Sequence, residues 1–226
     1  MPSAHVIASD ISPGLLKILL DSASAENLTN LSTWCFDLHQ RLFEEQSFDL
    51  VIGGSILHHM FDPVVALRNL SLSMRPGSPL LLYEPMEEGA HLMCVVYQAL
   101  CSELRHEADQ RLLHFFQAMI KDYEHRFGVG VVKPWTSHLD DKWLFNRFYL
   151  EDLASQVGLS LEVMHGLAGD EGLMISNNVL STLAASGNGD LEIPPKMLEI
   201  LREFDEGISG TIKQRAQPER LIVFRK

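Results

Sequence analysis

The sequence predicts an α/β protein with a mostly parallel sheet and helices on both faces. Residues 48–52 and 80–83 are two short apolar runs rich in strand formers, and each ends at turn residues. Between them, apolar residues recur at helical spacing after Pro63, with Asp62 as the expected N-cap. Strand, helix and strand within about forty residues form a right-handed crossover, which joins parallel strands.

The N-terminal residues repeat this strand-and-helix pattern. Residues 5–9 predict a strand that ends at Asp10, and Ser12 followed by Pro13 predicts a helix start. Residues 33–36 predict a second short strand, which ends at Asp37. We expect the helix between these strands to bury its apolar residues, which are Leu15, Leu16, Ile18, Leu19 and Leu20.

The rest of the chain continues the α/β pattern. Residues 88–149 contain two amphipathic helical patterns, one from Leu92 to Leu104 and one from Leu112 to Tyr123. Further patterns predict the helix 148–157, the strand 159–165, the helix 194–208 and the strand 221–224. Because no repeat or linker interrupts residues 1–226, we expect a single domain.

Composition narrows the classes of function. A net charge of −12 argues against nucleic-acid partners, because phosphates would be repelled. The three cysteines have no metal-ligand spacing, which predicts free thiols in a reducing compartment. No apolar run has the roughly 20 residues of a membrane span, and the N-terminus does not read as a signal peptide. We therefore expect a cytoplasmic protein that binds a small molecule; the sequence leaves its oligomeric state open.

Three motifs resemble those of class I S-adenosylmethionine-dependent methyltransferases of the small-molecule type (methyltransferase type 11-like). FDLVIGGSILHHMFDP resembles that family's fourth strand and turn, and SMRPGSPLLLYEP resembles the segment into its fifth strand. HVIASDISPGLLKIL is similar to the second-strand motif. The resemblance implies a Rossmann-like fold, S-adenosyl-L-methionine as cofactor and methyl transfer to a small-molecule acceptor. It also implies that the insertion at about 88–149 is a lid, in which Phe116 and Trp135 are candidates for acceptor contacts.

The resemblance assigns cofactor-binding roles at three strand ends. Asp10, with Ile11 beside it, would bind the ribose; a carboxylate before a helix suits two ribose hydroxyls. Asp37 and Leu38 would meet the adenine. Small residues suit a backbone that approaches the methionine part closely. In this sequence they are Gly53, Gly54 and Ser55.

Two further residues are candidates for catalysis. His58 is a possible general base near neutral pH. Glu84 ends a strand at the same sheet edge, where it would orient a substrate amine or hydroxyl or form a salt bridge at the rim. The adjacent His58 and His59 are expected to face apart on a helix, so we predict no metal site.

The family's first strand and its glycine-rich GxGxG turn have no counterpart before His5. We therefore expect a shortened domain, with about 40 or more residues missing upstream, the size of one βαβ unit. Such a chain would bind the cofactor poorly. This leaves two alternatives to a methyltransferase. One is a catalytically impaired or non-catalytic remnant that acts as an interaction module, and the other is a nucleotide-linked oxidoreductase that uses Asp10 for a ribose.

Overall fold

The computed structural model of this chain describes residues 4–105, 109–128, 141–166 and 171–226. The bounds of its strands and α-helices follow. The strands are β1 (Val6–Asp10), β2 (Leu31–Cys35), β3 (Val51–Gly54), β4 (Pro79–Pro85), β5 (Ser160–Gly166) and β6 (Glu219–Arg225). The α-helices are α1 (Pro13–Ala25), α2 (Pro63–Ser73), α3 (Glu87–Glu103), α4 (Gln110–Arg126), α5 (Arg147–Gln156), α6 (Met174–Leu183), α7 (Pro195–Gly207) and α8 (Gly210–Arg215).

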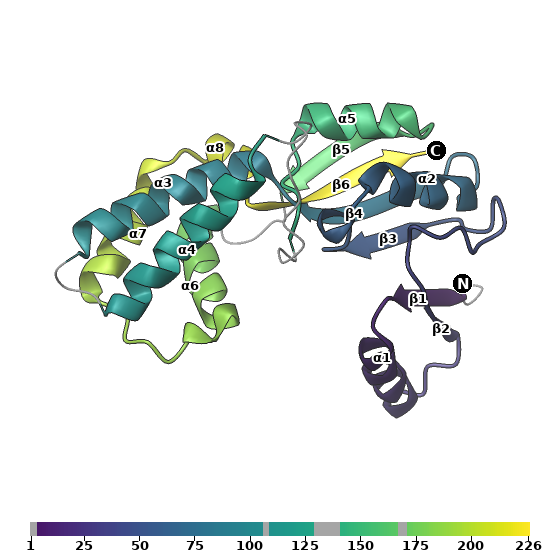
Figure 1. Ribbon diagram of the computed structural model, residues 1–226, viewed down its shortest axis with the longest axis horizontal. Coiled ribbons are helices and arrows are strands. Elements are labelled where there is room, and N and C mark those ends of the chain that lie inside the picture. The colour runs from purple at the N-terminus through teal and green to yellow at the C-terminus, as the bar shows by residue number, and fades with distance from the viewer. Residues whose placement is uncertain (1–3, 106–108, 129–140, 167–170) are drawn as a thin grey trace.

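The strands lie in two separate sheets (Figure 1). β1 and β2 form a parallel pair in which Asp10 is opposite Cys35. The other sheet has the order β3-β4-β6-β5; its β3–β4 pair is parallel, and β6 runs antiparallel to both β4 and β5. The crossover predicted from residues 48–85 is confirmed, with α2 as its helix. The C-terminal strand β6 supplies the antiparallel pairs.

The larger sheet buries one face beneath α2 and α5. Along β4, burial alternates with a period of two, and the buried residues face the helices. This core contains Leu67, Leu80, Leu82, Leu150, Ile222 and Phe224, all of them fully buried. The opposite face is less covered, because Leu81, Tyr83, Leu221 and Val223 are only half-buried.

The helix caps predicted from the sequence are present. The side chain of Ser12 accepts a hydrogen bond from the Leu15 amide, and that of Asp62 accepts bonds from the amides of Val64 and Val65. The prediction that α1 buries its five apolar residues is wrong, however. Only Leu16 of its five apolar residues is buried, because α1 packs on a sheet of just two strands; the others, Leu15, Ile18, Leu19 and Leu20, are exposed.

An aromatic cluster joins the smaller sheet to the start of β3. The ring of Phe43 contacts the rings of Trp34, Phe36 and Phe48, with centroids 4.8–5.5 Å apart. A hydrogen bond from Asn69 on α2 to the Leu38 carbonyl adds a second link. The connection between the sheets therefore packs against the α2 side of the larger one.

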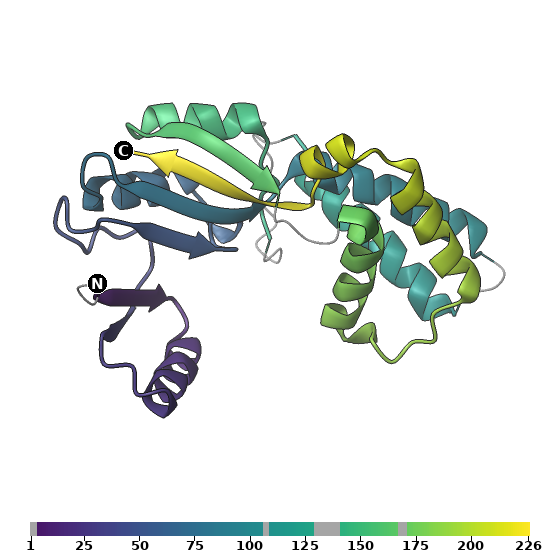
Figure 2. The same ribbon diagram turned by 180° about the vertical axis from the view of Figure 1, so that it is seen from behind.

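A helical body formed by α3, α4, α6 and α7 has its own core (Figures 1 and 2). Tyr97 on α3 stacks on Phe116 of α4, and both side chains are fully buried. The helical body is thus built from two separate stretches of sequence, of which the second, α6 and α7, lies outside residues 88–149, the insertion predicted to be a lid. Among the described helices, none is long and apolar enough to cross a membrane.

Candidate functional site

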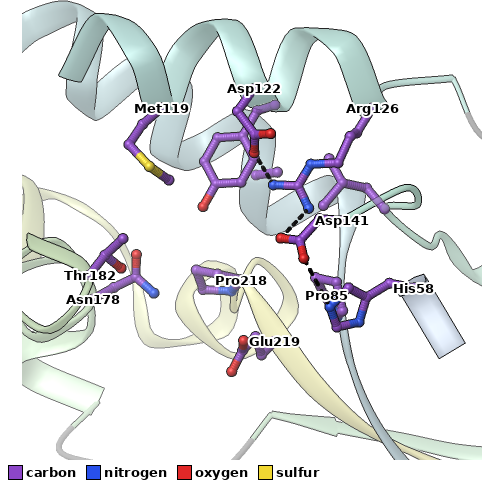
Figure 3. Close-up of a pocket in the computed structure, with 13 residues that line it drawn as sticks. His58, Pro85, Met119, Asp122, Arg126, Asp141, Asn178, Thr182, Pro218 and Glu219 are labelled. Atoms are coloured by element: carbon purple, nitrogen blue, oxygen red, sulfur yellow. Dashed lines mark hydrogen bonds and ion pairs between the residues drawn. The ribbon is translucent and has the colours of Figure 1, made fainter. Parts of the chain in front are cut away.

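A cavity of about 420 Å³ lies between the carboxyl end of β4 and the helical body. Figure 3 shows polar and charged side chains that line it from several elements. They include His58, Asp122, Arg126, Asp141, Asn178 and Glu219. Gly89 at the start of α3 allows this helix to pack closely against Pro218, since a Cβ at Gly89 would lie 2.4 Å from the Cα of Pro218. The position agrees with the rule that ligands bind beyond the carboxyl ends of strands in open α/β sheets.

Glu84 holds the turn that carries His58. The chain leaves β3 through Ser55, whose φ is +54°, and forms the short 3₁₀ turn Leu57–His59. The fully buried Glu84 carboxylate accepts hydrogen bonds from the amides of Ile56, Leu57 and His58, at 2.7–3.2 Å. It also accepts one from Nδ1 of His58, at 2.7 Å. Glu84 therefore lies beneath the site and positions His58, rather than lying at the rim.

A chain of charges leads from His58 into α4. Nε2 of His58 lies 3.5 Å from Oδ1 of Asp141. Oδ2 of Asp141 is 3.3 Å from the guanidinium of Arg126, which also pairs with Asp122. Arg126 is buried on the otherwise apolar side of α4, so both carboxylates serve to neutralise its charge.

The carboxylates set the protonation states in this chain. Burial alone would lower the pKa of His58, but its contacts with Asp141 and Glu84 outweigh burial and raise the pKa to about 9. The contact with His58 and the charge of Arg126 outweigh the effect of burial on Asp141 and lower its pKa to about 2. At neutral pH His58 is therefore protonated, and it donates a proton to its neighbours more readily than it accepts one.

His59 lies beside the same charged side chains as His58. The prediction that the two histidines face apart is therefore wrong. Their ring centroids lie 4.0 Å apart, and Nδ1 of His59 is 3.5 Å from the same Oδ1 of Asp141. The physical reason is a shared acceptor. Nε2 of His58 and Nδ1 of His59 both reach Oδ1 of Asp141, so the two rings turn toward the same carboxylate.

The cavity also presents polar atoms that pair with nothing in the described chain. Oδ1 of Asn178 on α6 is buried without a hydrogen-bond partner among the described residues, and so is Nε of Arg126. Buried polar groups are normally paired, so both side chains have unused hydrogen-bonding capacity at the wall of the cavity. Burial raises the pKa of Tyr123, another lining residue, to about 12.

The residues predicted to bind the cofactor lie elsewhere, at the ends of β1, β2 and β3. Asp10 is half-buried, and its Oδ1 accepts a hydrogen bond from the Ser12 amide at 2.7 Å. Ile11 beside it is exposed. Asp37 accepts hydrogen bonds from the amide and from Nδ1 of His39; the amide bond, then the side-chain bond, lower its pKa.

At the end of β3, the glycines differ in their surroundings. A Cβ on Gly53 would lie 2.7–2.8 Å from the side-chain ends of Ile56 and Leu82, so a larger residue there would have to displace these side chains. A Cβ on Gly54 would meet nothing within 4 Å, and Ser55 is exposed. Hence Gly54 and Ser55 are the residues whose backbone is open to a ligand.

The structure thus separates the predicted residues into two groups. Those assigned to the cofactor lie at three strand ends, and none of them lines the cavity; His58 does, with Glu84 behind it. Of the two lid residues, Phe116 is buried core, and Trp135 lies outside the described residues. Sequence reasoning missed Arg126 and Asn178. The signal for Arg126 was its place one turn after Tyr123, where the apolar stripe of α4 continues.

Comparison with known proteins agrees with this architecture. Residues 1–82 match the family model described as a methyltransferase domain. The YafE protein of Escherichia coli (strain K12) is 31% identical over 84 residues, which are 37% of this chain and 41% of that protein. The matched region is therefore less than half of the relative's length. Of these two matches, the family model supports methyl transfer as the general class of chemistry.

Solved structures show the fold over nearly the whole chain. A protein from Galdieria sulphuraria, proposed to be a sarcosine dimethylglycine methyltransferase, superposes with a TM-score of 0.52 at 15% identity, covering 97% of this chain and 69% of that one. A proposed methyltransferase from Bacillus halodurans gives 0.51 at 13% identity, covering 98% and 82%. The [4+2]-cyclase SpnF gives 0.55 at 14%, covering 99% and 66%. The chain has the Rossmann-like fold of class I methyltransferases, as its sequence predicts.

Proposed function

We propose that this chain transfers a methyl group from S-adenosylmethionine to a small molecule held in the cavity between the sheet and the helical body. The observation that carries the proposal is the methyltransferase-domain match to residues 1–82, which contain every residue assigned to the cofactor. In this proposal the cofactor lies along the ends of β1, β2 and β3, at Asp10, Ile11, Asp37, Leu38, Gly53, Gly54 and Ser55.

The reaction depends mainly on how the acceptor and the methyl donor are aligned. Methyl transfer is an in-line displacement from a sulfonium, so holding acceptor and donor in register supplies most of the effect. His58 is protonated at neutral pH, and it therefore serves as a donor that orients the acceptor and not as a base. Asp122 and Asp141 already pair with Arg126, so Glu219 is the lining carboxylate that favours an acceptor with a cationic or hydrogen-bond-donating group.

Calorimetric titration with S-adenosylhomocysteine and, separately, with NAD tests the cofactor assignment. We expect binding of the first and none of the second. Asp10→Asn keeps the acceptor for the Ser12 amide but removes the charge facing the ribose, so affinity should fall by roughly 1.5–3 kcal/mol, or about 10- to 150-fold. Asp21→Asn is the matched control, because Asp21 is exposed on α1 and pairs only with Lys17 in the described chain. Equal affinity in the wild type and Asp10→Asn contradicts the ribose role.

One observation favours the non-catalytic alternative. The residues assigned to the cofactor are divided between two sheets, and no backbone ladder joins those sheets in the described chain. A ligand that needs both sheets would have to fix their relative position, which costs binding energy. Absence of any heat with S-adenosylhomocysteine, for a chain that melts cooperatively, would support the interaction module. Binding of NAD alone would support the oxidoreductase.

A further inference from the structure

Three potential metal ligands converge at the wall of the cavity. They are Nε2 of His58, Nδ1 of His59 and a carboxylate oxygen of Asp141, and ligand atoms of the three residues lie within 4.8 Å of one another. Both imidazoles approach the same oxygen, Oδ1 of Asp141, at 3.5 Å. The arrangement combines two imidazole nitrogens with one anionic oxygen, a set that first-row transition ions bind in exchange for the imidazole proton.

The distances also match those between two ligand atoms that share an ion. Hydrogen bonds between a ring nitrogen and a carboxylate are about 2.7–3.2 Å long. Two ligand atoms that share a tetrahedral zinc ion at about 2.0–2.2 Å are separated by roughly 3.4 Å. The two separations of 3.5 Å at Asp141 match that edge. The third separation, between the two ring nitrogens, is within 4.8 Å.

The surroundings orient the ligands as metal sites require. His58 donates its other ring nitrogen, Nδ1, to Glu84 at 2.7 Å, which leaves Nε2 as the atom that faces Asp141. The second oxygen of Asp141 is held by Arg126 at 3.3 Å. Glu84 is fully buried and bound by three backbone amides, so the position of His58 is fixed before any ion arrives.

The ion would also have room for further ligands. His58 and Asp141 both line the cavity of about 420 Å³, so water or an oxygen of a bound molecule could reach the ion from that side. Two imidazoles with a single carboxylate favour zinc and similar ions over Mg²⁺ or Ca²⁺, which prefer oxygen ligands. We propose that His58, His59 and Asp141 form a binding site for one divalent transition-metal ion, open to the cavity.

The test is direct titration of the metal-depleted protein. The chain is treated with EDTA, dialysed and titrated with Zn²⁺ by calorimetry and with Co²⁺ by visible absorption, without any cofactor. All variants carry Cys35→Ser, because the exposed Cys35 thiol would itself attract zinc. We expect one equivalent to bind and Co²⁺ to give the absorption of a site with nitrogen and oxygen ligands. His59→Gln and Asp141→Asn should each weaken binding at least about tenfold.

A control variant and a check of folding accompany the titration. His165→Gln is the matched control, since His165 is exposed on β5, away from the cavity lining, and its loss should leave the affinity unchanged. His59 and Asp141 are 36% and 42% exposed at their side chains, so both variants should fold, which a cooperative melt without metal verifies. No stoichiometric binding, or equal affinity in all variants, overturns the proposal. Because no cofactor is present, a failed methyl-transfer assay does not affect this result.

Discussion

Glu84 determines the shape of the site more than any other single residue. Glu84 lies at the carboxyl end of the buried strand β4. Its side chain accepts hydrogen bonds from three amides that have no backbone partner in the 3₁₀ turn after β3. A buried carboxylate is tolerated only where it is paired, and here its partners include the ring of His58. The orientation of His58 toward the cavity is therefore a consequence of where β4 ends.

The raised pKa of His58 predicts how stability depends on pH. A histidine with a folded pKa of about 9, against about 6.5 when unfolded, contributes stability that is complete below about pH 6.5 and is lost as the pH rises through about 9. In the presence of EDTA, we expect thermal melts between pH 6 and pH 10 to show this loss, on the order of 3 kcal/mol at most.

Asp141→Asn provides the internal comparison for this pH series. Removing that carboxylate takes away the first of the two contacts that raise the pKa of His58, so the loss of stability should be smaller and should be complete at a lower pH. Identical pH profiles for the wild type and Asp141→Asn would show that Asp141 does not influence the pKa of His58.

Residue-level prediction from the sequence succeeded where local chemistry decides and failed where tertiary packing does. The caps Ser12 and Asp62 follow from residue type and spacing, and both are present. Glu84 was assigned to the correct sheet edge, but its burial depends on a turn 28 residues away that no local pattern shows. Asp141 meets His58 for the same reason: the contact joins segments 83 residues apart.

At the scale of elements, the strands and most helices could be read from periodicity, whereas α6 could not. Its sequence, MISNNVLSTL, has a weak helical signal with two asparagines, and no strong N-cap precedes it. The structure supplies the missing cap from another helix. Asp205 on α7 accepts hydrogen bonds from the amides of Ile175 and Ser176 and from the Ser176 hydroxyl, at 2.6–3.0 Å. The helix exists because its partner satisfies its first turn.

Loss of this cap should destabilise the helical body. Asp205 is buried and lies 3.9 Å from the buried ammonium of Lys213, so Asp205→Ala removes the cap and leaves a buried charge poorly compensated. We expect a loss of about 3 kcal/mol or more in the free energy of unfolding, measured by urea denaturation.

Asp190→Ala is the matched control for Asp205. Asp190 is exposed and pairs with Arg111, and an exposed pair is worth at most about 1 kcal/mol. Equal effects of the two substitutions would mean that α6 does not depend on Asp205. Ligand binding in the cavity provides a second measure of the effect of Asp205→Ala, because Asn178 and Thr182 line the cavity from α6.

At the scale of the whole molecule, apolar exposure is concentrated where the two sheets end. In the described chain, β1 pairs only with β2, and β3 pairs only with β4, so each sheet has an open parallel edge. Large apolar side chains are exposed near these edges, namely Val6, Ile11, Leu15, Ile18, Leu50 and Ile52. Such edges favour pairing with another strand, including one from a second copy of the chain.

The open edge of β3 leads to a prediction about self-association. Ile52 lies in the middle of this short strand with its side chain 69% exposed. A lysine at this position places a charge where another strand would approach, which is how natural proteins protect open edges. We expect Ile52→Lys to reduce the concentration-dependent mass seen by light scattering, with little change in the melting temperature. Val95→Lys is the control, since Val95 is exposed on α3 in the helical body, and it should leave association unchanged. Association that persists in Ile52→Lys but disappears in Val95→Lys would place the contact on the helical body and not on the sheet edge.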